Sequence, residues 1–544
     1  METSAAKAED QVTDLAPFME RCRLVPYKHQ VYGIQRIIEN PYFGLFDEMG
    51  AGKTLQTIVS ALIMFELGMI DRVLIIAPAS LRSSVWWDPE LGELAKHLWM
   101  DTPSSVVEYH SRVRAWTRGP KDVGSLQWMV TNYEFVRFKE RLEQVLPFCT
   151  ENTLLVLDES SAVKNAGSLQ TKACMKLRAH CGRVLLLNGT PIANSPEDMY
   201  SQSKIMSPSV LGCPTKTHFM SRYAIMGGYM VRNRPVQVIG WQNLEDLQKR
   251  MAPFVIRRLK TDCLDLPPKL PPVTLTATLT SDTWKVYREM RDDMVAWLSS
   301  SQVSSSEQII TKYLRLAQIT SGFLGGVQTM EDTELPLEYI EDPDRPAWMA
   351  PLLVERETKP AQQVVDGVIE VGREKLDLTL EWFAERLAED PELKLMLWCR
   401  FRPELMRLLG EMKVKFPDMP VASIVGGQNR TEREYALRLL DPRTSPKGAL
   451  CVGGTYGTGS KGLNCTASHT MLNVSYDYDL EKFLQSSDRV HRPGQTSPVS
   501  YFDIVAVGPK GQKTIDHITL MARRGKENMA TWTQSAWVRA LSEE

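Results

Sequence analysis

The chain has 544 residues, of which 43% are hydrophobic and 24% are charged. This composition is typical of folded soluble proteins and excludes a disordered chain, and the length exceeds what one hydrophobic core usually supports, so about three compact units are expected. Lysine and arginine number 64 against 66 aspartates and glutamates, a net charge of −2. Overall charge therefore gives no indication of a polyanionic partner. Binding of nucleic acid would require a local cluster of basic side chains.

The sequence carries no sign of export or membrane insertion. No apolar run approaches the roughly 18 residues of a membrane span, and the opening METSAAKAEDQ lacks the hydrophobic segment of a secretion signal. The nine cysteines form no CxxC pair, which predicts reduced thiols that bind no metal. We expect an intracellular monomer with a loose tail over residues 1–17, cytoplasmic if the source is prokaryotic or viral and nuclear if it is eukaryotic.

Between residues 18 and 200, short apolar runs alternate with longer amphipathic ones. The expected strands are FGLF, RVLIIAP, WMVTNY, NTLLVLDE and GRVLLLNGTP, and the expected helices are LQTIVSALIMFELG and LQTKACMKLRAH. This alternation predicts an α/β lobe with a parallel sheet covered on both faces. DEMGAGKT, APAS, DESS and NGTP follow strands, at the sheet edge where such folds bind ligands.

Residues 201–372 are expected to form helical protrusions followed by an acidic insertion. Helical periodicity marks LEDLQKRMAPFVIRRLK, TWKVYREMRDDMVAWLSS and EQIITKYLRLAQIT. The acidic stretch 331–344 favours a solvated loop, and a flap that competes with nucleic acid is the alternative. Residues 373–544 repeat the α/β alternation, from LDLTLEWFAERL to VSYFDIVAV, which predicts a second lobe with a C-terminal helical segment and a nucleotide bound between the lobes.

The segment DEMGAGKT, residues 47–54, ends as a phosphate-binding loop ends. Gly50, Ala51 and Gly52 would bring backbone N–H groups close to a polyphosphate, Lys53 would reach the terminal phosphates, and Thr54 could ligate Mg²⁺. Asp47 stands where the standard loop has its first glycine.

An acidic pair at the end of a second strand is the partner that such a loop needs. LLVLDES supplies Asp158, which could hold Mg²⁺ through water, and Glu159, which could orient and deprotonate the attacking water. A solvated turn is the alternative for two adjacent carboxylates. With the phosphate-binding loop upstream, the pair favours ATP hydrolysis with ATP and Mg²⁺ as cofactors.

Five segments together resemble one known family. DEMGAGKT, LDESSAVKN, LLLNGTPIAN, FVIRRLKTDCLDLPPK and QSSDRVHRPGQ follow the motif order of the Swi/Snf-type ATPases of helicase superfamily 2, and the resemblance extends from about Leu24 to Asp516. In that family an acidic DE replaces the first glycine, so Asp47 matches the family's own form. The resemblance implies two RecA-like α/β lobes, ATP hydrolysis and duplex DNA as the partner.

The resemblance also assigns roles to individual residues. Gln30 matches the glutamine that reads the adenine edge, and Gln485 is a further nucleotide-binding candidate. Gly189, Thr190 and Pro191 match the motif that couples hydrolysis to lobe movement. The matches to nucleic-acid contacts are Ala77, Pro78, Thr131, Asn132, Arg257, Arg258, Lys260, Gly426, Gly427, Gln428, Gly459, Lys461, Gly462 and Asn464. For each of these, ordinary loop or core packing is the alternative.

The segment QSSDRVHRPGQ carries two arginines. Arg489 and Arg492, three apart on a short helix, would share one face, from which they could reach across a cleft to the γ-phosphate of ATP and stabilise the transition state. Salt bridges on a surface helix are the alternative.

The chain departs from the family pattern at a few positions. Ser161 replaces the usual histidine of DExH, Asn188 precedes Gly-Thr-Pro, and Tyr478, Asp479 and Leu480 replace Trp-Asn-Pro. DESS and RVHRPGQ favour the fork-acting, DNA-annealing branch.

We expect a Mg²⁺-dependent, DNA-stimulated ATPase that moves along duplex DNA without sequence preference. The alternatives are a strand-separating or annealing helicase on DNA or RNA, and a nucleic-acid-binding scaffold whose ATP site has decayed. The sequence identifies no wedge that would separate strands.

Overall fold

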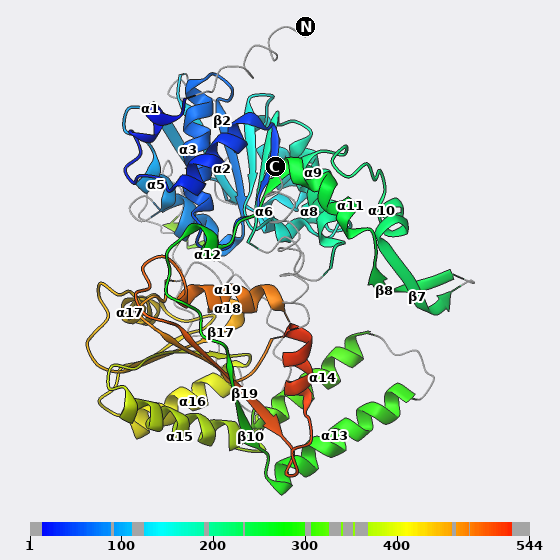
Figure 1. Ribbon diagram of the computed structural model, residues 1–544, viewed down its shortest axis with the longest axis vertical. Coiled ribbons are helices and arrows are strands. Elements are labelled where there is room, and N and C mark those ends of the chain that lie inside the picture. The colour runs from blue at the N-terminus through cyan, green and yellow to red at the C-terminus, as the bar shows by residue number, and fades with distance from the viewer. Residues whose placement is uncertain are drawn as a thin grey trace. The chain divides into compact units, whose positions relative to one another are not determined.

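The computed structural model describes residues 14–88, 92–110, 124–189, 195–231, 234–299, 306–325, 339–340, 352–353, 368–459, 464–477 and 479–524. The chain divides into two compact units, Met1–Leu266 with Arg524–Glu544, and Pro267–Arg523. Each unit is built on a parallel sheet with helices on both faces (Figure 1). This division differs from the boundaries expected at residues 200 and 373. The strand at Val255–Ile256 belongs to the first sheet, and the strand at Val273–Thr278 belongs to the second.

The first sheet has seven parallel strands in the order β3-β4-β2-β5-β6-β1-β9. They are β1 (Tyr42–Leu45), β2 (Arg72–Ala77), β3 (Ser104–Glu108), β4 (Leu126–Asn132), β5 (Thr153–Leu157), β6 (Arg183–Leu187) and β9 (Val255–Ile256). The five strands expected from the sequence are confirmed, and β3 and β9 are additional.

Alternate residues of each central strand pack into two different cores. On β2, Val73 and Ile75 belong to the core that covers one face, whereas Leu74 and Ile76 belong to the core on the other. The first face is covered by α2 (Lys28–Glu39) and α3 (Lys53–Glu66), and the second by α8 (Leu169–Arg178) and α9 (Asp198–Met206). Burial on both faces explains why these strands are apolar without a break.

Shorter elements complete the first unit. They are α1 (Ala16–Met19), α4 (Ala79–Leu81), the π-helical turn η1 (Arg82–Trp87), α5 (Glu93–His97), α6 (Tyr133–Val136), α7 (Lys139–Val145), η3 (Leu146–Phe148), η4 (Ser160–Val163), α10 (Lys216–Tyr223), α11 (Leu244–Met251), η5 (Ala252–Phe254) and α12 (Lys260–Cys263).

The second sheet has six parallel strands in the order β10-β19-β18-β15-β17-β16. They are β10 (Val273–Thr278), β15 (Lys394–Cys399), β16 (Val421–Ile424), β17 (Leu450–Thr455), β18 (Thr470–Asn473) and β19 (Ser500–Val507). α15 (Glu374–Glu389) and α16 (Arg402–Lys415) cover one face, and α17 (Arg430–Leu440) and α19 (Leu480–Val490) cover the other. The α/β alternation expected after residue 373 is confirmed in the described residues, and β10 is additional.

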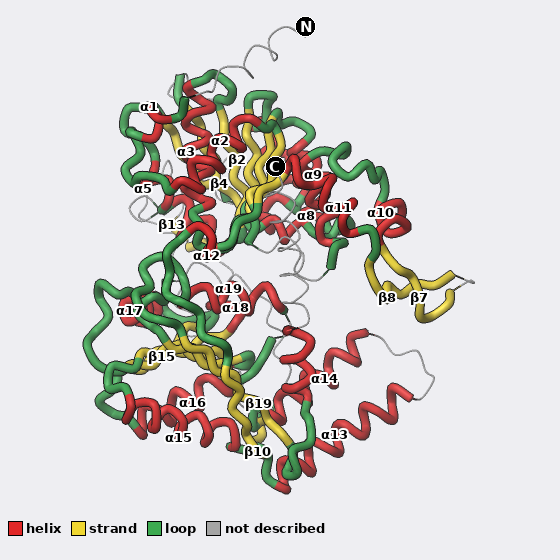
Figure 2. The backbone as a smooth tube through the Cα atoms, in the orientation of Figure 1, coloured by secondary structure: helices red, strands yellow, loops and turns green. Residues whose placement is uncertain are grey.

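The region from 201 to 320 is not wholly helical, which corrects the expectation from its sequence. β7 (Ala224–Val231) and β8 (Arg234–Trp241) form an antiparallel hairpin between α10 and α11 (Figure 2). The pairing shifts register after Ile225 and again after Gly227. Such bulges break the two-residue period by which a strand is recognised. The helices α13 (Ser281–Ser299) and α14 (Ser306–Thr320) are confirmed.

Most of the acidic insertion 331–344 lies outside the described residues. Its described part, β12 (Tyr339–Ile340), pairs with β13 (Leu352–Leu353), while β11 (Phe323–Leu324) pairs with β14 (Ile369–Glu370). α18 (Tyr456–Gly459) and a helix over residues 515–524 complete the second unit. Across the described ranges, no helix has both the length and the apolar character that crossing a membrane requires.

Candidate nucleotide and nucleic-acid sites

The phosphate-binding loop forms the turn between β1 and α3. Gly50 and Gly52 have φ angles of 88° and 78°, in the left-handed region that glycine adopts most readily. A Cβ at Gly52 would also lie 2.1 Å from Nε2 of Gln30. Lys53 is the first residue of α3, which has 14 residues, so the loop presents the N–H groups of a helix N-terminus as an anion site requires.

Lys53 points back into its own loop. Its Nζ donates to the backbone carbonyl of Asp47 at 2.8 Å and to that of Glu48 at 3.4 Å. Burial lowers the pKa of the Lys53 ammonium, while the charges of Glu159, Asp47 and Asp158 act to raise it. The ammonium therefore lies in a strongly acidic surrounding, where phosphate oxygens would have to compete for it.

Gln30 lies against the phosphate-binding loop. Its Oε1 accepts from the Tyr27 N–H at 2.9 Å, which caps α2, and its Nε2 donates to the Ala51 carbonyl at 3.2 Å. His29 Nε2 lies 3.1 Å from the same carbonyl. The structure thus brings Gln30 to the loop, and its contact with adenine remains a prediction.

Asp158 is held by three neighbouring elements at the end of β5. Its Oδ2 accepts from Nε1 of Trp86 in η1 at 2.8 Å, its carbonyl accepts from the Tyr133 hydroxyl at 2.8 Å, and its N–H donates to Ile76 of β2 at 2.9 Å. Burial raises the pKa of Asp158, while the Trp86 N–H and the Lys53 charge act to lower it. Sequence reasoning missed Trp86, although SVWWDPE is an aromatic run close after the strand.

Glu159 adopts a conformation that few non-glycine residues adopt. Its φ is 49° and its ψ is 58°, which places it in the left-handed region, and its N–H donates to Oδ1 of Asp158 at 3.0 Å. Such conformations cost free energy and occur disproportionately at functional sites. Asp158 and Thr54 supply carboxylate and hydroxyl oxygens, the donors that Mg²⁺ prefers.

One buried glutamine joins the acidic pair to the coupling motif. Gln202 of α9 accepts at Oε1 from the Ser160 hydroxyl at 2.7 Å and from Nδ2 of Asn188 at 3.5 Å. Ser160 follows Glu159, and Asn188 precedes Gly189, so hydrogen bonds connect the two motifs. No sequence pattern marked Gln202. Ser161 donates to the Glu159 carbonyl at 3.5 Å, and Thr190 and Pro191 lie outside the described residues.

Arg257, Arg258 and Lys260 do not form the exposed basic face expected for nucleic acid. Arg257 is 8% exposed and Lys260 is 1% exposed. Arg257 donates to the Gly189 carbonyl at 3.1 Å, Arg258 pairs with Asp47, and the Lys260 N–H donates to Glu48 Oε2 at 2.8 Å. Sequence alone did not show that Asp47 and Glu48 would face Arg258 and Lys260, and contact of these cations with nucleic acid stays a prediction.

The nucleic-acid candidates of the first unit meet at the carboxyl ends of two adjacent strands. β2 and β4 pair in parallel with Ala77 opposite Asn132, so Ala77–Pro78 and Thr131–Asn132 lie side by side. Ala77, Thr131 and Asn132 are buried, and Pro78 is half-buried. Any contact with a polymer would therefore involve Pro78 and backbone groups.

The matching loops of the second unit also lie together. Gly426, Gly427 and Gln428 follow β16, and the Thr458 hydroxyl of α18 donates to the Ile424 carbonyl of that strand at 3.3 Å. Gly427 has a φ of 72°, a glycine conformation. The Gln428 side chain turns back and donates to the Ser423 carbonyl at 2.7 Å. Gly459 ends α18 and Asn464 is exposed, while Lys461, Gly462 and Tyr478 lie outside the described residues.

The two candidate arginines do not share a helix, which corrects the expectation. α19 ends at Val490, so Arg489 lies in its last turn and Arg492 lies in the turn that follows. Burial raises the pKa of Cys465 to about 12, and the charges of both Arg489 and Arg492 act to lower it. Both guanidinium groups therefore lie within electrostatic range of that thiol. Gln485, on the same helix, is buried.

The rest of this motif is anchored within the second unit. Asp488 pairs with Lys269 at 3.1 Å, and His491 Nε2 lies 2.7 Å from the carbonyl of Pro267. Gln495 donates to the carbonyl of Ser468 at 2.8 Å. These bonds fix the end of α19 and the turn that carries Arg492.

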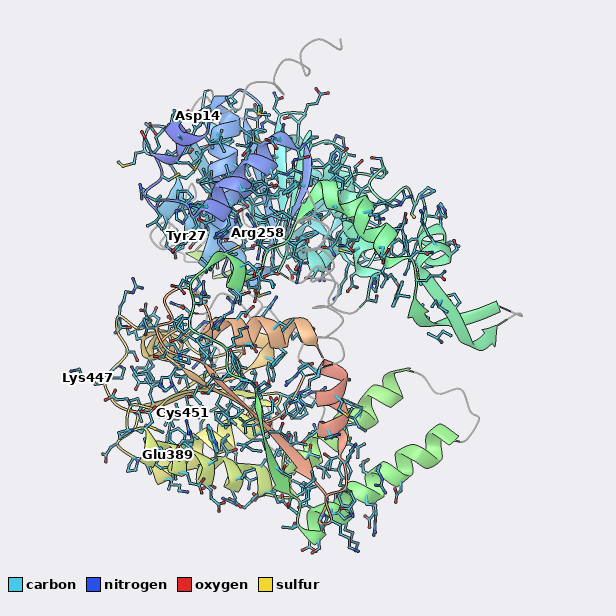
Figure 3. The ribbon with its side chains drawn as sticks, in the orientation of Figure 1. Asp14, Tyr27, Arg258, Glu389, Lys447 and Cys451 are labelled. Carbon is cyan, nitrogen blue, oxygen red and sulfur yellow. The ribbon has the colours of Figure 1, made fainter. Side chains whose placement is uncertain are left out.

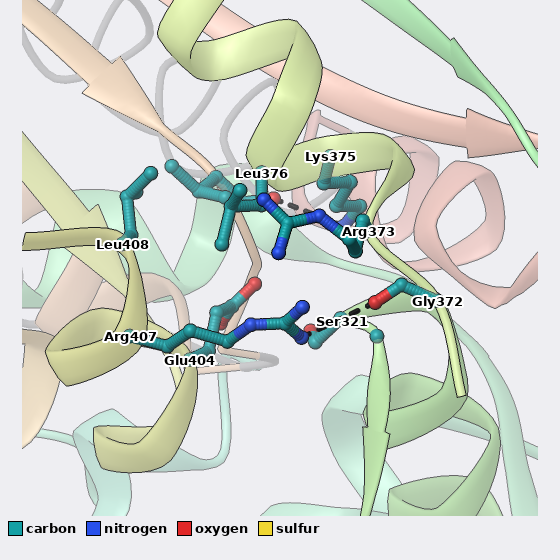
Figure 4. Close-up of a pocket in the computed structure, with 10 residues that line it drawn as sticks. Ser321, Gly372, Arg373, Lys375, Leu376, Glu404, Arg407 and Leu408 are labelled. Carbon is teal, nitrogen blue, oxygen red and sulfur yellow. Dashed lines mark hydrogen bonds between the residues drawn. The ribbon is translucent and has the colours of Figure 1, made fainter. Parts of the chain in front are cut away.

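The second unit also contains a small cavity beside α15 and α16 (Figure 4). It encloses about 20 Å³, enough for one water molecule and far too little for a nucleotide. Glu404 lines it, and burial raises the pKa of this carboxyl to about 7.

A phosphate-binding loop and an acidic pair at the carboxyl edge of a parallel sheet define a P-loop nucleotide hydrolase, and the second sheet makes this chain a protein of two RecA-like lobes. The family model described as the SNF2-related domain matches residues 43–322, just over half of the chain. The chain therefore belongs to this family of Swi/Snf-type proteins.

Two relatives match the chain over most of its length at low identity. The chain is 24% identical over 540 residues to the "TATA-binding protein-associated factor mot1" of Schizosaccharomyces pombe, covering 88% of this chain and 24% of that protein. It is 24% identical over 506 residues to an "Uncharacterized ATP-dependent helicase" of Mycoplasma pneumoniae, covering 92% of this chain and 41% of that protein. The chain thus spans well under half of either relative.

A solved structure, "Sulfolobus solfataricus SWI2/SNF2 ATPase core in complex with dsDNA", is 20% identical with a TM-score of 0.38, covering 90% of this chain and 89% of that one. At that TM-score the likeness adds nothing to what the two sheets establish.

Proposed function

We propose that this ATP hydrolase moves along double-stranded DNA without sequence preference, driven by cycles of ATP binding and hydrolysis. One observation carries the proposal. In a chain of the SNF2-related family, Lys53, Asp158 and Glu159 gather at one edge of the first sheet, and the charges of both carboxylates act on the Lys53 ammonium.

The first unit holds the nucleotide in this proposal. Backbone N–H groups of the glycine-rich loop and the Lys53 ammonium bind the phosphates. Thr54 and Asp158 hold Mg²⁺, which neutralises charge on the phosphate oxygens when it is bound. Glu159 orients the attacking water and accepts its proton. The Trp86 N–H keeps the Asp158 carboxylate in one orientation.

The second unit supplies the cations in this proposal. Arg489 and Arg492 approach the γ-phosphate when the two units close on ATP, and they stabilise the charge that develops there. An arginine in this role accelerates hydrolysis by about 10³ to 10⁵. Closure and reopening would then advance the protein along its track. The anchored turn around Arg492 supports this role. Because the turn already restricts the backbone that carries the arginine, less conformational entropy is lost when Arg492 binds the phosphate.

Two loop pairs are the proposed contacts with DNA. Pro78 and the backbone near Thr131 act in the first unit, and the loops that contain Gly426–Gln428 and Gly459–Asn464 act in the second. Backbone N–H groups bind phosphates and read no bases, so the contact would carry no sequence preference. Affinity should then fall steeply with salt.

A strand-separating helicase is the second candidate, because the Mycoplasma pneumoniae relative is named an ATP-dependent helicase. The two are distinguished by giving the full chain a DNA triplex and a forked duplex with ATP. A translocase displaces the third strand from the triplex and leaves the fork paired. Efficient separation of the fork would support the helicase instead, and failure on both substrates together with no ATP hydrolysis would support the decayed scaffold.

A further inference from the structure

The segment that leads out of the first unit is bonded to the phosphate-binding loop. β9 pairs with β1 in parallel. Beyond both strands the pairing continues, because the Phe46 N–H donates to the Ile256 carbonyl at 2.8 Å and the Glu48 N–H donates to the Arg258 carbonyl at 2.9 Å. Side chains at Asp47 and Arg258 are thereby held face to face.

Arg258 occupies both oxygens of the Asp47 carboxylate. Its Nε donates to Oδ1 at 2.9 Å and its Nη2 to Oδ2 at 2.5 Å. Asp47 is 0% exposed, and a buried carboxylate that lacks a cationic partner is strongly destabilising. Arg258, whose place in the first unit is labelled in Figure 3, also donates to the His29 carbonyl of α2, and Gln56 donates to Asp47 Oδ2 at 3.3 Å. Hydrogen bonds from α2, α3 and the segment after β9 therefore fix the Asp47–Arg258 pair.

A second cation lies close enough to compete for the same carboxylate. Lys53 Nζ donates to the backbone carbonyl of Asp47 at 2.8 Å, and the charge on Asp47 acts on the Lys53 ammonium. With Arg258 in place, the ammonium bonds the carbonyl and Arg258 takes the carboxylate. Without Arg258, the buried charge of Asp47 would attract the Lys53 ammonium, which already bonds the backbone carbonyl of the same residue.

We propose that Arg258 is a positioning residue for ATP binding, which holds the Asp47 carboxylate away from Lys53 so that the ammonium remains available to phosphate oxygens. The proposal rests on the proposed ATP hydrolase activity. It assigns to Arg258 the task of keeping Lys53 able to bind phosphate. It also explains how an aspartate is tolerated where the standard loop has glycine. Since Arg258 belongs to the segment that leaves the unit, movement of that segment changes the loop directly.

The test measures the affinity of the full chain for a non-hydrolysable ATP analogue with Mg²⁺ by titration calorimetry. Arg258→Met should weaken binding at least about tenfold, because Asp47 then captures Lys53. The double variant Asp47→Asn with Arg258→Met removes both charges, so its affinity should return to within about threefold of the wild type. A purely structural pair would instead lower the unfolding temperature of Arg258→Met and leave the ATP affinity of the folded variant unchanged.

The matched control is Arg250→Met, since Arg250 donates to both oxygens of Asp246 at 3.1 Å in the same unit and should leave ATP affinity unchanged. Thermal unfolding checks that each variant is folded. If Arg258→Met does not fold, Asp47→Asn decides, because it removes the competing carboxylate and should keep or tighten binding.

Wild-type affinity in Arg258→Met, a folded double variant as weak as Arg258→Met, or weakened binding in folded Asp47→Asn would overturn the proposal. Failure of the wild type to bind or hydrolyse ATP would instead refute the ATPase assignment.

Discussion

At the scale of single residues, the candidate ATP site depends on side chains whose part in it the sequence did not indicate. Trp86 fixes the carboxylate of Asp158, and Gln202 joins Ser160 to Asn188. Arg258 neutralises Asp47. Each acts on a motif residue from an element that is distant in sequence, so each became visible only when the strands were brought together.

Trp86→Phe tests this view because it keeps the ring and removes the N–H that Asp158 accepts. A hydrogen bond to a charged group contributes about 1.5 to 3 kcal/mol, so kcat/KM for ATP should fall about ten- to hundredfold, and more Mg²⁺ should be needed for half-maximal rate. Steady-state phosphate release across a Mg²⁺ titration measures both.

Trp128→Phe is the matched control for this substitution. Trp128 is 1% exposed in β4, and its indole N–H has no acceptor within the described part of the chain, so its rate and Mg²⁺ dependence should match the wild type. An equal loss in both variants would mean that Trp86 acts through packing alone.

At the scale of elements, the end of α19 is held by the segment that opens the second unit. Lys269 pairs with Asp488 at 3.1 Å, and Pro267 contacts His491. Because Asp488 precedes Arg489, Lys269→Met should lower kcat about two- to fivefold, as a part-exposed ion pair allows. KM for ATP should stay unchanged, because phosphate binding belongs to the first unit.

Lys482→Met is the control for that prediction. Lys482 lies on the same helix and pairs with Asp477 at 3.6 Å, with 42% of its side chain exposed against 39% for Lys269. Its kcat should match the wild type. A changed KM with unchanged kcat in Lys269→Met would show that this anchor does not act on the arginines.

A second prediction at this scale concerns α16, whose Glu404 is buried beside Lys375, Asp516, Ser475 and Ser321. Burial raises the pKa of Glu404 from 4.5 to about 7, so the folded state binds the proton more tightly. The contribution of Glu404 to the free energy of unfolding should therefore be fully present below pH 4.5 and decline as pH rises to about 7. At about 1.4 kcal/mol per pKa unit the decline is at most about 3.5 kcal/mol.

Glu404→Gln should remove this decline, which denaturant unfolding between pH 5 and pH 8 measures. Glu411→Gln is the control, because Glu411 lies on the same helix in a part-exposed ion pair with Arg373 at 3.1 Å and should retain the wild-type slope. Parallel pH profiles for Glu404→Gln and the wild type would show that Glu404 is not the group responsible.

At the scale of the whole molecule, the sequence predicted what depends on local pattern. Unbroken apolar runs identified the central strands, because both faces are buried, and the glycines and acidic pair marked the nucleotide site. The hairpin β7–β8 escaped because its bulges break the two-residue period. The pairing of Arg258 with Asp47 and of Lys260 with Glu48 was not predicted, because the strand that aligns them, β9, has two residues and is too short to show a period.

The central claim is that duplex DNA drives the ATPase, and the most direct measurement is ATP hydrolysis by the full chain with no polymer, single-stranded DNA, duplex DNA or RNA. Glu159→Gln is the negative control, because it keeps the phosphate-binding loop and loses the proposed general base. The account predicts that duplex DNA of any sequence raises the wild-type rate several-fold more than the other polymers do, and that Glu159→Gln stays inactive with all of them. A rate unaffected by duplex DNA, or raised most by RNA, would contradict it.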